Sequence, residues 1–200
     1  MQKSKQKSKR LERIKIMNFK VARLLPYNKM MDQVKSIDIA KIGNVREDFS
    51  YDMDEWEKGE GCYRHLIEFL PRLASFYSNL AKETQNLLWF NDAANTFEVV
   101  LGGDGAPFGK QDTACSWLCS FLNRGKHILS SNESFLILGA NCHEDSLVVQ
   151  RYVKFLLNEI SHIEKQTFNV DGVDIKFRFS EFPNDLKMLA LLAGELPVSA

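Results

Sequence analysis

The segment "TFNVDGVDIKFRF", residues 167–179, places the strongest constraint on the fold because it predicts an antiparallel β-hairpin. Apolar side chains alternate on both sides of Asp171 and Gly172, as expected for strands with one buried face. Asp-Gly favours a two-residue hairpin turn, since both residues adopt a positive φ at low cost. We therefore expect one strand on each side of this dipeptide.

Three further strands are expected before the hairpin. They are "TFEVVLGG" (96–103), "ACSWLCSFLN" (114–123) and "SFLILGAN" (134–141). Cys115, Trp117, Cys119 and Phe121 alternate along the second of them, which indicates a strand packed on a core rather than a metal site. Ser146 suits the N-cap of a long helix with one apolar face. A last helix is expected in "NDLKMLALLAGEL" (184–196). The element order predicts an α+β fold.

Composition and charge predict three zones. Residues 1–45 are expected to be a basic helical segment, residues 46–95 an acidic linker and helical region, and residues 96–200 the core. Within the middle zone, apolar residues recur at helical spacing from Leu66 to Leu80, with an interruption expected at Pro71. The chain is 44% hydrophobic and 26% charged, which suffices to bury a core. Its apolar runs are too short to span a membrane, so we expect no membrane partner.

The glycine cluster in "VVLGGDGAPFGK", residues 99–110, allows three interpretations. A phosphate-binding Walker loop is disfavoured, because Asp104 replaces its first glycine and Gln111 replaces its hydroxyl residue. A tight turn at Asp104-Gly105 is a second interpretation. The third is a carboxylate at the end of a strand that binds a divalent metal ion, since Mg²⁺ prefers hard oxygen ligands.

A family resemblance favours the third interpretation. The motifs "FEVVLGGDG" (97–105), "FLILGANCHED" (135–145), "VVQRYVKFLLNEISHIEK" (148–165) and "VDIKFRFSEFPNDLKMLALLAGEL" (173–196) resemble the catalytic region of the V(D)J recombinase large subunit and of Transib-like transposases. The resemblance covers roughly residues 96–196 and rests on element order and these short motifs. It implies a ribonuclease-H-like core that opens with three strands and a helix, the first strand ending in a catalytic aspartate.

The resemblance also implies a metal centre with Mg²⁺ or Mn²⁺, which activates water or a 3′-hydroxyl. The first catalytic aspartate, a metal ligand, maps onto Asp104. The family's acid after the third strand has its nearest counterpart at Asn141. Glu144 and Asp145 follow three and four residues later and are the further expected metal ligands. The family's remaining acids lie downstream of this region, so we expect an incomplete acid set and a truncated core. Asp185 is either a second ligand or a helix cap, and its position before a helix favours the cap.

The N-terminal arm is strongly basic and predicts a contact with nucleic acid. Its cations are Lys3, Lys5, Lys7, Lys9, Arg10, Arg13 and Lys15. Such a run contacts DNA phosphates, binds a nuclear import receptor, or forms a solvated tail. The expected function is therefore that of a nuclear, transposase-like DNA-binding protein with metal-assisted phosphodiester cleavage and strand transfer, as a partial or inactive copy. The alternative is a non-catalytic, transposon-derived nuclear module that binds DNA or protein. DNA is the expected partner, and a homodimer is an open expectation.

Overall fold

The computed structural model describes residues 26–38, 40–84, 87–108 and 112–181. The chain divides into two compact units, residues 1–38 and 39–200, and each is considered by itself. The described part of the first unit contains helix α2, Tyr27–Ser36. The basic arm of residues 3–15 lies outside the described residues.

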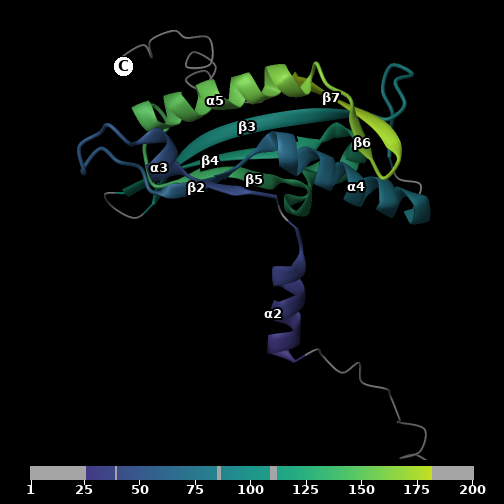
Figure 1. Ribbon diagram of the computed structural model, residues 1–200, viewed down its shortest axis with the longest axis horizontal. Helices are drawn as coiled ribbons and strands as arrows, with labels where there is room; N and C mark the ends of the chain where they lie inside the picture. The colour runs from purple at the N-terminus through teal and green to yellow at the C-terminus, as the bar shows by residue number, and fades with distance from the viewer. Residues whose placement is uncertain (1–25, 39, 85–86, 109–111, 182–200) are drawn as a thin grey trace, which may run out of the picture. The chain divides into compact units, whose positions relative to one another are not determined.

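A curled seven-stranded sheet organises the second unit (Figure 1), and its strand order is β1-β2-β5-β4-β3-β7-β6. All neighbouring strands are antiparallel except β3 and β7, which run parallel. A parallel pair needs a crossover connection, and the chain between β3 and β7 includes β4, β5 and α5. The strands are β1 (Ile42–Asn44), β2 (Gly61–Arg64), β3 (Thr96–Phe108), β4 (Asp112–Phe121), β5 (Phe135–Ala140), β6 (Phe168–Val170) and β7 (Val173–Glu181).

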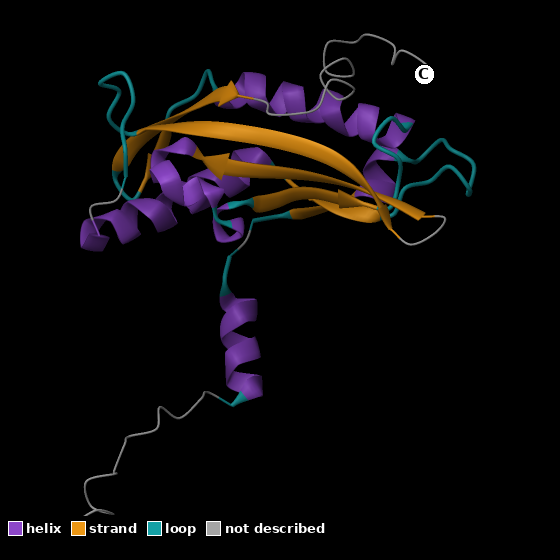
Figure 2. Ribbon diagram, turned by 180° about the vertical axis from the view of Figure 1, so that it is seen from behind, coloured by secondary structure: helices purple, strands orange, loops and turns teal. Residues whose placement is uncertain are grey.

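Two long helices, α4 (Leu66–Thr84) and α5 (Leu147–Ile163), pack against the curled sheet (Figure 2). They contact the face that carries Trp117 and Phe121. The ring of Tyr152, from α5, lies 6.3 Å from the Trp117 ring, and the ring of Tyr77, from α4, lies 5.9 Å from the Phe121 ring. The helical elements of this unit are α3 (Val45–Phe49), α4 (Leu66–Thr84), α5 (Leu147–Ile163) and the 3₁₀ segments η1 (Leu122–Leu129) and η2 (Ser131–Glu133). The main core therefore lies between the sheet and these two helices.

The α+β class and several local predictions are confirmed. Asp171 and Gly172 have φ values of 51° and 80° and connect β6 to β7. The Ser146 hydroxyl accepts a hydrogen bond from the Val149 N–H and caps α5. The interruption expected at Pro71 is wrong, because α4 continues through it. Tertiary packing of the apolar face on both sides of the proline outweighs its local preference.

The alternation predicted for the second strand is also confirmed. Cys115, Trp117, Cys119 and Phe121 are each at most 1% exposed, whereas Leu118, between two of them, is 39% exposed. Successive side chains of β4 therefore point to a buried face and to a more open face, as a pleated strand requires.

Two arginines form ion pairs with the acidic stretch between β1 and β2, residues 47–60. The Arg46 guanidinium pairs with Glu55 and Glu60, and Arg151 from α5 pairs with Asp52 through two hydrogen bonds. The strands on either side of this stretch pair with each other, and β2 pairs with β5. These contacts place the acidic stretch in the same unit as the sheet.

Candidate functional site

Asp104 lies inside β3, which pairs with the strand that contains Trp117. Asp104 is opposite Ser116 and Gly103 is opposite Trp117 in an antiparallel ladder. This pairing was predicted and is confirmed. The Walker-loop interpretation is excluded, because the cluster is strand and not a loop before a helix, and the tight-turn interpretation is wrong for the same reason. The strand continues to Phe108, so Asp104 is near its end rather than at it.

The two glycines beside Asp104 allow other groups to approach the strand closely. A Cβ at Gly103 would lie 2.4 Å from the Trp117 ring, and one at Gly105 would lie 2.7 Å from a carboxylate oxygen of Glu144. Both contacts are shorter than atoms tolerate, so a side chain at either position displaces its neighbour. The glycines therefore allow a buried tryptophan and an acidic loop to pack against the same strand.

Glu144 is the sequence-predicted site residue that contacts β3. Its carboxylate Oε2 accepts a hydrogen bond of 3.1 Å from the Gly105 N–H. Asp104 is exposed, and its side chain leaves β3 on the face opposite to Gly105, because alternate residues of a strand point to opposite faces. The structure thus brings Asp104 and Glu144 to one end of the sheet and places them on opposite sides of the strand.

Asp145 forms an ion pair with a residue of the same loop. Its carboxylate Oδ1 lies 3.6 Å from the Nδ1 atom of His143, and both side chains are exposed. Both residues belong to the connection between β5 and α5. This connection is held in place by Asn141, whose Oδ1 accepts a 2.6 Å hydrogen bond from the Glu60 N–H and whose N–H donates to the Glu60 carbonyl.

The described carboxylates at the Asp104 end of the sheet do not make a complete metal centre. Among residues 26–38, 40–84, 87–108 and 112–181, no three histidine, cysteine or acidic side chains converge as a metal site. Asp185, the further candidate ligand, lies outside the described residues. The assignment of Asp104, Glu144 and Asp145 as metal ligands therefore stays a prediction, and no catalytic step is derived through a metal ion.

The buried cysteine near this end is unsuited to nucleophilic or ligand chemistry. Burial, with smaller contributions from the nearby Cys142, Glu144 and Asp104, raises the pKa of Cys115 to about 12. The thiol is therefore protonated at neutral pH, whereas a nucleophile or metal ligand has to be a thiolate. This agrees with the interpretation of Cys115 as a core residue.

Sequence reasoning missed the residue that anchors the other end of β3. Asn123 is fully buried and uses its side-chain amide three times. Its Oδ1 accepts from the Glu98 N–H at 2.7 Å, and its Nδ2 donates to the carbonyls of Leu88 and Thr96 at 2.8 and 3.1 Å. A lone asparagine after a strand carries no sequence signal for such a role.

Comparisons with known proteins add no family to these observations. Neither the protein-family models nor the curated proteins include a match to this chain. No helix in the described part of the chain is long and apolar enough to cross a membrane.

Proposed function

We propose that this chain is a transposase-like DNA-binding protein with a ribonuclease-H-like core, in which the end of the sheet around Asp104 faces the nucleic acid. The observation that carries the proposal is the position of Asp104. It lies on β3, which is followed by two antiparallel strands and a long helix, the element order that the family resemblance implies. β7 then returns to pair in parallel with β3.

The distribution of charge supports different roles for the basic arm and for the Asp104 end of the sheet. The basic arm carries seven cations between Lys3 and Lys15 and one acid, Glu12, whereas the Asp104 end of the sheet carries carboxylates. Cations on an arm bind phosphates without reading sequence. Carboxylates repel phosphates unless a divalent ion lies between them. We therefore propose that affinity for DNA comes from the arm, and that the same arm serves as a nuclear import signal.

A second candidate function is metal-assisted phosphodiester cleavage and strand transfer. The observation that favours it is the Glu144 carboxylate, which is fixed on the N–H of the residue next to Asp104. Glu144 and Asp104 flank β3 from opposite faces, so they do not form a shared metal site by themselves, and they are fewer than the family's chemistry requires. We therefore place binding first and catalysis second.

The test of the first proposal is the salt dependence of duplex binding. Changing the seven cations of the arm to glutamine should weaken binding to unrelated duplexes by similar factors. The slope of log affinity against log salt should fall by about 0.9 for each phosphate that the arm no longer neutralises. A control variant that changes Lys154 and Lys165 to glutamine should retain both affinity and slope. Unchanged binding by the arm variant would contradict the proposal.

A further inference from the structure

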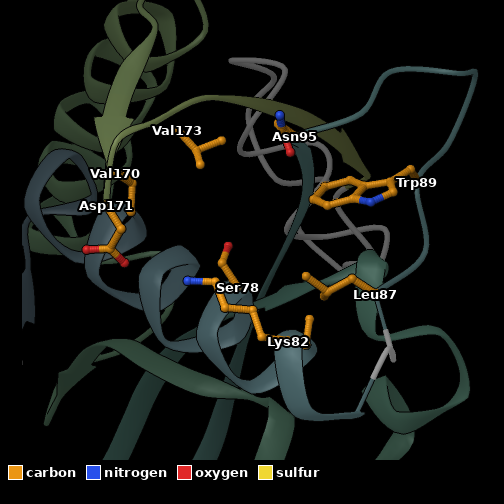
Figure 3. Close-up of a pocket in the computed structure, with 9 residues that line it drawn as sticks. Ser78, Lys82, Leu87, Trp89, Asn95, Val170, Asp171 and Val173 are labelled. Atoms are coloured by element: carbon orange, nitrogen blue, oxygen red, sulfur yellow. The ribbon is translucent and has the colours of Figure 1, made fainter.

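A pocket separate from the Asp104 end lies between α4, the segment 87–95 and the β6–β7 hairpin. Its volume is about 350 Å³. Figure 3 shows Trp89 and Leu87 on one side of the pocket, Val170 and Val173 on the other, and Lys82 at the base. The pocket is therefore a slot with an aromatic wall and an aliphatic wall.

The aromatic wall is held in position by the buried core. Trp89 is 39% exposed, and its ring packs edge-on against the buried Phe97 at 5.4 Å. The preceding residue, Leu88, is fixed through both backbone groups, because its N–H donates to the Asn123 carbonyl and its carbonyl accepts from the Asn123 side chain. Trp89 is thus preorganised, and a ligand does not have to order this segment before it binds.

The opposite wall is also fixed. Asp171, in the hairpin turn, accepts hydrogen bonds from Ser75 at 2.5 Å and from the Asn79 Nδ2 atom at 3.2 Å. Both bonds are accepted by the Asp171 Oδ2 atom and connect the turn to α4. Asp171 therefore positions Val170 and Val173.

Lys82 and Asn95 are two of the polar residues at the pocket that have hydrogen-bonding capacity left. The Lys82 ammonium donates one 2.9 Å hydrogen bond to the Asn79 Oδ1 atom and has two further N–H groups. The Asn95 side chain has no hydrogen-bond partner among the described residues, and Figure 3 shows it beside Trp89. Asn95 has a φ of 60°, a left-handed conformation in which asparagine is favoured among residues with a side chain.

We propose that this pocket binds a single unpaired adenine nucleotide. The base stacks on Trp89, the Asn95 amide pairs with the N6 and N7 edge of adenine, and Lys82 binds the phosphate. Base stacking on an aromatic side chain and bidentate pairing of asparagine with adenine are established recognition modes. A phosphate alone leaves Trp89 unused, and an aliphatic ligand leaves Lys82 and Asn95 unused. The pocket chemistry fits either a free nucleotide or an unpaired base of a DNA strand.

The test uses the full chain and the fluorescence of Trp89. The protein has three tryptophans, of which Trp117 is buried and Trp56 is 81% exposed, so a Trp56→Phe background leaves Trp89 as the exposed reporter. The probes are adenosine monophosphate, cytidine monophosphate, adenosine, inorganic phosphate and a single-stranded oligomer of deoxyadenosine. We expect adenosine monophosphate to quench Trp89 and to bind more tightly than cytidine monophosphate or inorganic phosphate. If the oligomer binds more tightly than adenosine monophosphate, the ligand is an unpaired base of a DNA strand. If it binds equally or more weakly, the ligand is a free nucleotide.

Three variants assign the contacts. By calorimetry, Trp89→Leu should weaken adenosine monophosphate binding about tenfold or more, because it removes the stacking surface. Lys82→Met should weaken adenosine monophosphate but not adenosine, and its control Lys126→Met, on η1, should change neither. Asn95→Gly tolerates the left-handed backbone and should remove the preference for adenine over cytosine.

The proposal is overturned if none of the adenine probes quenches Trp89 at millimolar concentration, or if Lys82→Met and Trp89→Leu bind adenosine monophosphate as the parent does. A thermal melt of each variant confirms that it is folded, and Lys82 is an exposed residue whose change leaves the core intact. The inference rests on the proposed DNA binding only in the case where the bound base belongs to a DNA strand. Asp104→Asn should retain nucleotide binding, so failure of the metal site and failure of this pocket are distinguishable.

Discussion

The two halves of β3 differ in how they are supported. The first half, Thr96–Val100, pairs with β7. On its other side, Val99 and Val100 pair with β4, and the buried Asn123 accepts the hydrogen bond of the Glu98 N–H. Among the described residues, the second half, Leu101–Phe108, pairs only with β4. It contains the glycines and the exposed Asp104, and its contact with Glu144 comes from a loop. The first half is therefore the more strongly anchored of the two, and the second half carries the exposed Asp104.

The largest effect on stability is expected at Asn123. Asn123→Ala removes three side-chain hydrogen bonds and leaves backbone groups of Leu88, Thr96 and the buried Glu98 without these partners. The free energy of unfolding should fall by about 3 kcal/mol, measured by urea denaturation. The exposed Asn132→Ala is the matched control and should cost less than about 0.5 kcal/mol. Equal effects of the two changes would show that the first half of β3 is not anchored in this way.

A pH-dependent effect on stability is expected at Glu133, in η2. The Glu133 carboxylate forms an ion pair with Arg124 at 3.1 Å and accepts a hydrogen bond from the Tyr77 hydroxyl. Burial raises the pKa of Glu133, but the Arg124 and Tyr77 hydrogen bonds outweigh it, so the pKa is lowered overall. A lowered folded-state pKa stabilises the protein above the ordinary glutamate pKa, and this stabilisation is lost as the pH falls through the folded value.

Glu133→Gln should therefore cost about 2 kcal/mol at pH 7, and the difference from the parent should shrink toward pH 3. Urea denaturation of both proteins across this range measures the difference. A gap that stays constant with pH would show that the Glu133 charge is not what stabilises the network.

Two alanine substitutions in the second half of β3 should differ in how much they lower the free energy of unfolding. Gly103→Ala places a methyl group against the rigid Trp117 ring and should cost about 1.5 kcal/mol. Gly105→Ala meets the flexible Glu144 side chain instead and should cost less than about 1 kcal/mol. Thermal denaturation of both variants checks the order. A larger cost at Gly105 would mean that the Glu144 contact is structural rather than adaptable.

The smallest effect on stability is expected at Asp104 itself. Asp104 is exposed and has no side-chain hydrogen bond among the described contacts, so Asp104→Asn should change the free energy of unfolding by less than about 0.5 kcal/mol. Urea denaturation in a metal-free buffer measures this. A destabilisation as large as that of Asn123→Ala would make Asp104 a structural residue and remove the contrast between the two halves.

Local chemistry explains which parts of this fold were predictable. The Asp171-Gly172 turn, the Ser146 cap and the alternation along β4 are each encoded within a few neighbouring residues. The path of α4 through Pro71 depends on packing against the sheet, which overrides the local signal. The strand containing Asp104 was predicted, but its extension to Phe108 depends on pairing with β4.

The candidate site was less predictable because its contacts join distant segments. Glu144 was proposed as a ligand, but its hydrogen bond to Gly105 spans 39 positions in the chain. The Asn123 contacts span up to 35 positions, and no sequence period announces them. The pocket at Trp89 combines three segments in the same way. Long-range contacts of this kind follow from the topology of the sheet and not from local patterns.

Binding of Mn²⁺ to the full chain, followed by the electron paramagnetic resonance signal of the free ion, tests the predicted role of Asp104 most directly. We expect the parent protein to deplete free Mn²⁺ and Asp104→Asn not to do so. Asp32→Asn in α2, the control with the same charge change, should behave as the parent. Equal depletion by the parent and by Asp104→Asn, or none by either, would contradict the prediction that Asp104 is a metal ligand.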